Sequence, residues 1–137
     1  MSTVNDLIAV HGVDIDPHLD RQATVPVSTG AQRQGDVIVI PAVMVGRGLS
    51  AAATPVPAAG VAVVRGEAGG NTHLLLADGP VRYDSTPAEL TLGVLTVENG
   101  AVAYLAHPEH GYAGIGPGTY VVRRQREQAD EIRMVQD

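Results

Sequence analysis

Histidines and carboxylates are the residues of this sequence whose types and spacing could form a reactive or binding site. His107 and His110 flank a Pro-Glu pair, and His73 follows a Gly-Gly turn earlier in the chain. Imidazole is the commonest protein ligand of transition metals, and two histidines in one turn can point to a shared ion. Since there is no Cys, such a site must use nitrogen and oxygen ligands. We predict a site for Zn²⁺, Mn²⁺ or Fe²⁺ built from His73, His107 and His110, with a carboxylate from Glu109 or Glu67.

A structural interpretation of the same histidines stays open. His-Pro-Glu-His is a favourable turn sequence, and its imidazoles can hydrogen-bond to backbone groups. A histidine at the start of a strand can also be half buried in the fold. Neither interpretation predicts catalysis by a serine, because none of the four serines has the strand-to-helix context of an activated nucleophile.

Two further stretches near the C-terminus were considered as binding sites. Arg123, Arg124 and Arg126 close a predicted strand that also carries Tyr120, a combination that can contact nucleic acid. The net charge of −6 leaves no wider basic patch, so we expect these arginines to protect a strand edge or form ion pairs, and nucleic acid is not an expected partner. The glycine-rich stretch 114–118 precedes a strand and lacks Lys, so we expect a tight turn and no phosphate site.

The composition limits the elements that can position these residues. The chain has no Phe or Trp and only four Tyr, so its core must consist mainly of small aliphatic side chains in closely packed layers. Sixteen Gly and nine Pro argue against long helices. No stretch reaches the ~20 apolar residues of a membrane span, and the first 30 residues do not resemble a signal peptide. We therefore expect a protein of the cytoplasm, or of a particle assembled inside a cell.

Short β-strands account for most of the chain. Strands are predicted over residues 36–45, 61–65, 73–77, 81–84, 89–98, 101–106 and 119–125, followed by a strand or helical turn over 130–135. Gly93 is expected at a bulge. Asn99-Gly100 is the strongest hairpin signal and predicts that strand 101–106 pairs with strand 89–98. The expected fold is all-β, a small antiparallel barrel or sandwich of about eight short strands.

The N-terminal region differs from the rest. Residues 1–33 are predicted to be an arm that includes a short helix, capped by Ser2 or Thr3 and ended by Gly12. We expect this arm to lie over its own domain or over a neighbouring subunit. Residues 34–137 are expected to form the β domain, with a low-complexity loop at 46–60.

Four motifs resemble a group of small uncharacterised bacterial and phage proteins. They are Q-G-D-V-x-x-I-P (34–41), G-E-x-x-G-x-x-H (66–73) and H-x-E-H (107–110), followed by P-G-x-Y-x-V-x-x-Q-R-E (117–127). Asn71 stands where that group usually has a further His. The resemblance implies the same fold and the same location of the site, and it brings no assigned activity.

Two functions fit these observations. The first is a non-catalytic β-module that acts as a structural or adaptor component of an assembly, including a phage particle, with a protein partner or its own copies. The alternative is a small His-ligated metalloprotein, with or without enzymatic activity.

Overall fold

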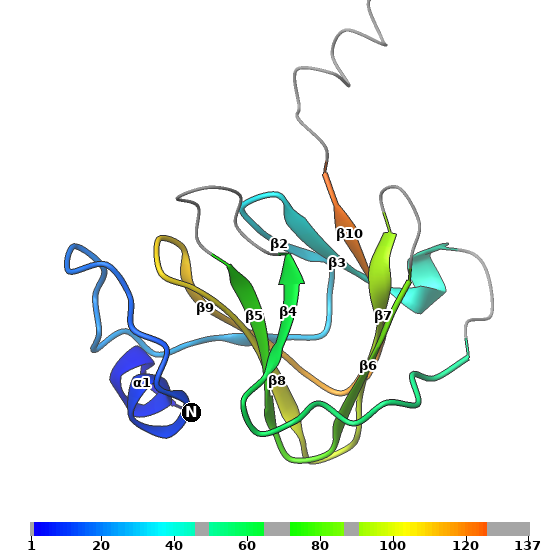
Figure 1. The fold of residues 1–137 in the computed structure, drawn as a ribbon, viewed down its shortest axis with the longest axis horizontal. Helices are drawn as coiled ribbons and strands as arrows, with labels where there is room; N and C mark the ends of the chain where they lie inside the picture. The colour runs from blue at the N-terminus through cyan, green and yellow to red at the C-terminus, as the bar shows by residue number, and fades with distance from the viewer. Residues whose placement is uncertain (1, 46–49, 65–71, 87–90, 126–137) are drawn as a thin grey trace, which may run out of the picture.

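A computed structural model of the 137-residue chain describes residues 2–45, 50–64, 72–86 and 91–125. The described part is mostly β, with a short N-terminal helix, as predicted (Figure 1). The elements run in chain order as α1 (Val4–His11), β1 (Val27–Ser28), β2 (Gln32–Gln34), β3 (Val37–Pro41), the 3₁₀ helix η1 (Ala42–Val45), β4 (Val61–Val64), β5 (His73–Asp78), β6 (Val81–Ser85), β7 (Thr91–Val97), β8 (Val102–His107), β9 (Gly111–Ile115) and β10 (Gly118–Arg124).

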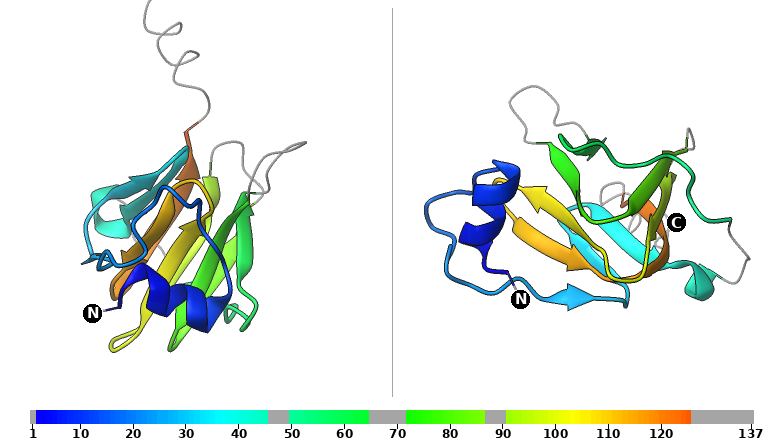
Figure 2. Two further views of the ribbon diagram at one scale, coloured as in Figure 1. Left: turned by 90° about the vertical axis from the view of Figure 1, so that its left-hand side faces the viewer. Right: turned by 90° about the horizontal axis from the view of Figure 1, so that it is seen from below.

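The strands form two five-stranded sheets. The first sheet has the order β1-β9-β8-β5-β4, and the second has the order β2-β3-β10-β7-β6. Neighbouring strands are antiparallel except for β1 and β9, which are parallel. The described strands form no closed barrel, so the arrangement is the sandwich-like form of the predicted fold (Figure 2).

A three-stranded ribbon runs continuously through both sheets. β5 pairs with β8 and β8 with β9 in the first sheet, while their continuations β6, β7 and β10 pair in the same order in the second. The bends fall at residues 79–80, 98–101 and 116–117, which are rich in Gly and Pro. Such residues suit a sharp change of strand direction. The two sheets are therefore largely two halves of one folded antiparallel sheet.

The Asn99-Gly100 hairpin prediction is wrong about strand pairing. The chain does turn there, since the Ala101 N–H donates to the Glu98 carbonyl at 3.0 Å, and Gly100 has φ 84°. However, β7 lies between β6 and β10 in the second sheet, whereas β8 lies between β5 and β9 in the first. The turn therefore joins the two sheets at a bend of the ribbon, because each flanking strand already pairs with two strands of its own sheet.

The 36–45 strand prediction is too long. β3 ends at Pro41, which pairs with Tyr120, and residues 42–45 form η1. Proline has no N–H with which to continue a ladder, so the chain leaves the sheet there. Strands β1, β2 and β9 were not predicted. Residues 65–71 and 126–137, which include Glu67, Arg126 and the expected element at 130–135, lie outside the described residues.

The 114–118 stretch is not one tight turn. It contains the end of β9, a bend and the start of β10. Gly114 lies so close to β1 that an added Cβ would be 2.8 Å from the Pro26 carbonyl oxygen. Glycine at this position therefore lets β1 add in parallel to the first sheet.

The main core lies between the two sheets. It consists mostly of aliphatic side chains from β3, β5 to β8 and β10, and the largest fully buried ones include Tyr120, Leu75 and Leu95. The Tyr120 hydroxyl donates to the Gly116 carbonyl at 2.7 Å, so this ring is anchored at the ribbon's bend. Small side chains thus form a close-packed layer, as the composition requires.

A second cluster fixes the N-terminal region on the outer face of the first sheet. Val4 and Leu7 of α1 pack with Tyr104 and Tyr112, and the Tyr112 hydroxyl donates to the Val13 carbonyl at 2.7 Å. The arm therefore lies over its own domain (Figure 2). The helix begins at the predicted cap Thr3, which forms a capping box with Asp6, and it ends at Gly12.

Replacing Thr3 with Ala is expected to lower the free energy of unfolding by about 1 kcal/mol, because the Asp6 N–H loses its side-chain acceptor. Chemical denaturation followed by circular dichroism measures the change. Val10→Ala is the control, since Val10 is 75% exposed on the same helix. Equal stability of the Thr3→Ala variant and the wild type would contradict a role for the cap.

Candidate functional site

Three histidines from distant parts of the sequence meet at one end of the sandwich. His73 begins β5, His107 ends β8, and His110 lies in the turn between β8 and β9. The ring centroids of His73 and His107 are 4.3 Å apart, those of His107 and His110 are 4.6 Å apart, and those of His73 and His110 are 6.1 Å apart. His73 and His107 are buried, whereas His110 is exposed. The cluster thus extends from the interior to the surface.

The turn between β2 and β3 completes this cluster. The Gln34 Oε1 atom lies 3.2 Å from His73 Nδ1, and the Asp36 Oδ1 atom lies 3.5 Å from His73 Nε2. Both residues flank Gly35. Sequence reasoning did not place either residue at the site. The Q-G-D-V motif was visible, but nothing in it indicates that the turn folds back onto His73.

Gly35 leaves space for the imidazoles. Its φ is 59°, and a Cβ added to it would lie 3.0 Å from His110 Nε2 and 3.3 Å from His73 Cε1. Both rings therefore lie against the backbone of this turn, in a position that a larger residue would fill. The left-handed conformation independently favours glycine here.

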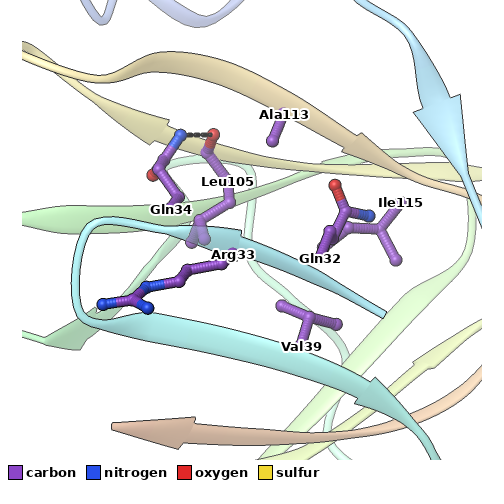
Figure 3. A pocket seen from close by; sticks show the side chains of 7 residues that line it. All are labelled: Gln32, Arg33, Gln34, Val39, Leu105, Ala113 and Ile115. Carbon is purple, nitrogen blue, oxygen red and sulfur yellow. Dashed lines mark hydrogen bonds between the residues drawn. The ribbon is translucent and has the colours of Figure 1, made fainter. Parts of the chain in front are cut away.

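The buried Gln34 side chain fixes which nitrogen of His73 carries the proton. Its Nε2 atom donates to the Leu105 carbonyl at 3.0 Å, a contact drawn in Figure 3, and to the Gly111 carbonyl at 3.1 Å. Because both amide hydrogens are used, Oε1 faces His73 as an acceptor, and His73 Nδ1 must be the donor. In the neutral ring, His73 Nε2 is then unprotonated and directed toward Asp36.

His107 has the opposite arrangement. The Glu109 backbone N–H donates to His107 Nδ1 at 3.1 Å, so the ring proton of neutral His107 lies on Nε2. Glu109 itself is exposed. Of the four predicted ligands, the structure therefore brings the three imidazoles together, and Glu109 contributes a backbone contact to His107. Among the described residues, no three His, Asp or Glu side chains already form a group that could hold a metal ion.

Burial controls the electrostatics of the cluster. It lowers the pKa of His73 from 6.5 to about 4, and the neighbouring His107 acts in the same direction, while Asp36 opposes the shift. A charged imidazole loses hydration when it is buried, so the neutral ring is favoured. His73 is therefore neutral at pH 7 and retains a lone pair.

The space beside the cluster is filled by side chains. Gln32, Gln34 and Ile115 are among the residues that lie between the β2–β3 hairpin and the first sheet in Figure 3, and they leave no room for a water molecule. Gln32 also donates to the Gly114 carbonyl at 3.1 Å. This region closes the sandwich, so the cluster is approached from the surface near His110.

The arginines of β10 have an ionic partner in this turn. Arg123 and Arg124 are exposed, and Arg124 Nε donates to Asp36 Oδ2 at 3.1 Å. Arg124 thus forms one of the predicted ion pairs, with Asp36 as its partner. Asp36 lies between a guanidinium and an unprotonated imidazole nitrogen.

Comparisons with known proteins give a family without an assigned function. A family model described as a domain of unknown function (DUF8820) matches residues 33–125. No curated protein and no solved structure matches the chain. In the described part, no helix has the length and apolar character needed to cross a membrane.

Proposed function

This chain belongs to the DUF8820 family of domains of unknown function, so its function must be inferred from its own surface. We propose that the protein is a non-catalytic β-module that acts as a structural or adaptor component of an assembly, in the cell or in a particle assembled there. A phage particle is one such assembly. The partner is another protein chain that receives an apolar corner of this domain.

The exposed corner η1 supports this proposal. Val43 and Met44 are 86% and 64% exposed, directly after the end of β3. Burying such apolar side chains against a partner is favourable, with a free energy gain of roughly 25 cal/mol for each Å² of apolar surface removed from water. The other large apolar side chains that are exposed in the described residues, Val10 and Val27, stand singly, whereas Val43 and Met44 are adjacent, so this pair indicates a contact surface.

The form of this surface indicates the kind of partner. The area that two side chains can bury is far less than the ~800 Å² per partner of a stable interface. Two copies joined through η1 alone would therefore separate, and a stable partner must enclose η1 in a recess. A net charge of −6 adds repulsion between copies. Edge strands offer little alternative, because β1, β2 and β4 have only two, three and four residues. The edge of β6 already forms backbone hydrogen bonds with Thr54 and Val56. A different protein with an apolar recess fits these features best.

Photo-crosslinking tests the proposal in cells that produce the protein naturally. A benzoylphenylalanine at position 43 is expected to give one strong product, identified by mass spectrometry. The same probe at Val10, an exposed valine on α1, is the matched control. With the partner purified, Met44→Ser is expected to raise the Kd about tenfold or more and leave the melting temperature unchanged.

The proposal fails if position 43 gives no product beyond that at position 10. It also fails if the purified partner binds wild type and Met44→Ser equally.

A further inference from the structure

We infer that Asp36, His73 and His110 bind one divalent cation of the zinc class at the turn between β2 and β3. This inference concerns a different surface from η1 and does not depend on the proposed partner. It replaces the Glu109 carboxylate expected from the sequence with that of Asp36.

His73 and Asp36 form an unfavourable contact that a cation would relieve. Gln34 makes His73 Nδ1 the donor, so the lone pair of His73 Nε2 faces the Asp36 Oδ1 atom at 3.5 Å. Two acceptors directed at each other repel unless a positive charge lies between them. A metal ion can use both lone pairs at once.

The spacing of these two atoms is that of two ligands of one ion. A tetrahedral ion bonded at ~2.1 Å to nitrogen and oxygen holds its ligands about 3.4 Å apart. The observed 3.5 Å separation of His73 Nε2 and Asp36 Oδ1 agrees with this value. The pair is therefore spaced as two neighbouring ligands of one ion before any movement of the chain.

His110 is the third ligand. A Cβ added to Gly35 would lie 3.0 Å from His110 Nε2 and 3.3 Å from His73 Cε1, and the His110 ring is parallel to that of His73 within 12°. The three side chains do not yet form a complete ligand group. Since His110 is exposed and lies in a turn, a side-chain rotation brings its nitrogen to the ion at small cost. The fourth position is then open to solvent.

The surrounding residues position these ligands. Gln34 orients the His73 ring, and Arg124 holds the other oxygen of Asp36 at 3.1 Å. Such outer contacts fix tautomer and direction in metal sites. His107 packs against both other rings at tilted angles of 37° and 39°, but its Nδ1 accepts the Glu109 N–H, so we assign it a packing role.

Calorimetric titration of the untagged full-length protein with Zn²⁺ tests the site. We expect one Zn²⁺ per chain, and we expect Co²⁺ to give the strong visible absorption of a tetrahedral complex. Asp36→Asn and His110→Ala are expected to weaken Zn²⁺ binding at least tenfold. Both side chains are partly or fully exposed, so these variants should fold. Gly35→Ala should also weaken binding, by separating the rings.

The control is His18→Ala, an exposed histidine of the N-terminal arm, which should bind Zn²⁺ like the wild type. Loss of binding in His18→Ala, or its retention in both Asp36→Asn and His110→Ala, would mean that Zn²⁺ binds elsewhere. Binding of less than ~0.1 Zn²⁺ per chain at saturation would show that the proposed site does not bind zinc.

Discussion

Gly93→Ala is expected to lower the free energy of unfolding by about 3 kcal/mol or more, which is a large part of the stability of a domain this size. A Cβ at this position would lie 2.5 Å from the Asp84 carbonyl oxygen and 2.5 Å from the Tyr83 ring. Atoms cannot approach so closely, and the first of these two belongs to the backbone of the neighbouring strand. Urea denaturation followed by circular dichroism measures the loss.

The environment of Gly93 explains why the structure cannot adapt easily. The pairing of β7 with β10 shifts there, with Gly93 opposite Val122 and Thr91 opposite Arg123. The predicted bulge is thus confirmed. Tyr83 is buried and its ring covers the glycine, so moving it would open the core.

Gly30→Ala is the matched control. Its added Cβ would meet only the Ser28 hydroxyl, at the ordinary distance of 3.6 Å. It should change the stability by less than about 0.5 kcal/mol. Equal stability of the Gly93→Ala and Gly30→Ala variants would contradict the tight packing of Tyr83 over β7.

Acidification from pH 7 to pH 4 in the presence of EDTA is expected to remove about 3 kcal/mol of stability through His73 alone. Its folded pKa is about 4, against an ordinary value of 6.5. Between these values the unfolded chain binds a proton that the folded chain does not bind. The unfolded state is therefore favoured as the pH falls, and the loss is complete near the folded pKa.

A His73→Gln variant isolates this effect, because Gln does not titrate. Other groups, such as Asp14 and Asp84, also have lowered pKa values and destabilise the fold in acid. These groups act equally in both proteins, so the difference between the two pH profiles belongs to His73. Parallel profiles between pH 7 and pH 4 would contradict the buried, neutral state of this imidazole.

Local sequence signals predicted local structure well. Thr3 and Gly12 begin and end α1 because caps are determined by neighbouring backbone groups. β-branched runs predicted β3 and β4, apart from the residues beyond Pro41. The sequence does not predict β9, because its glycines lower strand propensity. One of them, Gly114, is required by the close approach of β1, a distant segment.

Pairing between distant strands was not predictable in the same way. Asn99-Gly100 specifies that the chain turns, but a turn does not determine whether its strands pair with each other or join two sheets. That choice depends on the hydrogen bonds and buried area that β5, β6, β9 and β10 offer to β7 and β8.

Residue types and their spacing are enough to predict an all-β chain with an aliphatic core, a capped N-terminal helix and a set of histidines able to share a site. The contact of the Gln34–Asp36 turn with His73, and hence the position of the unprotonated nitrogen of that ring, follows from the folded arrangement. Residue type and spacing determine local backbone conformation, whereas contacts between residues 36, 73 and 110 depend on the packing of the whole sandwich.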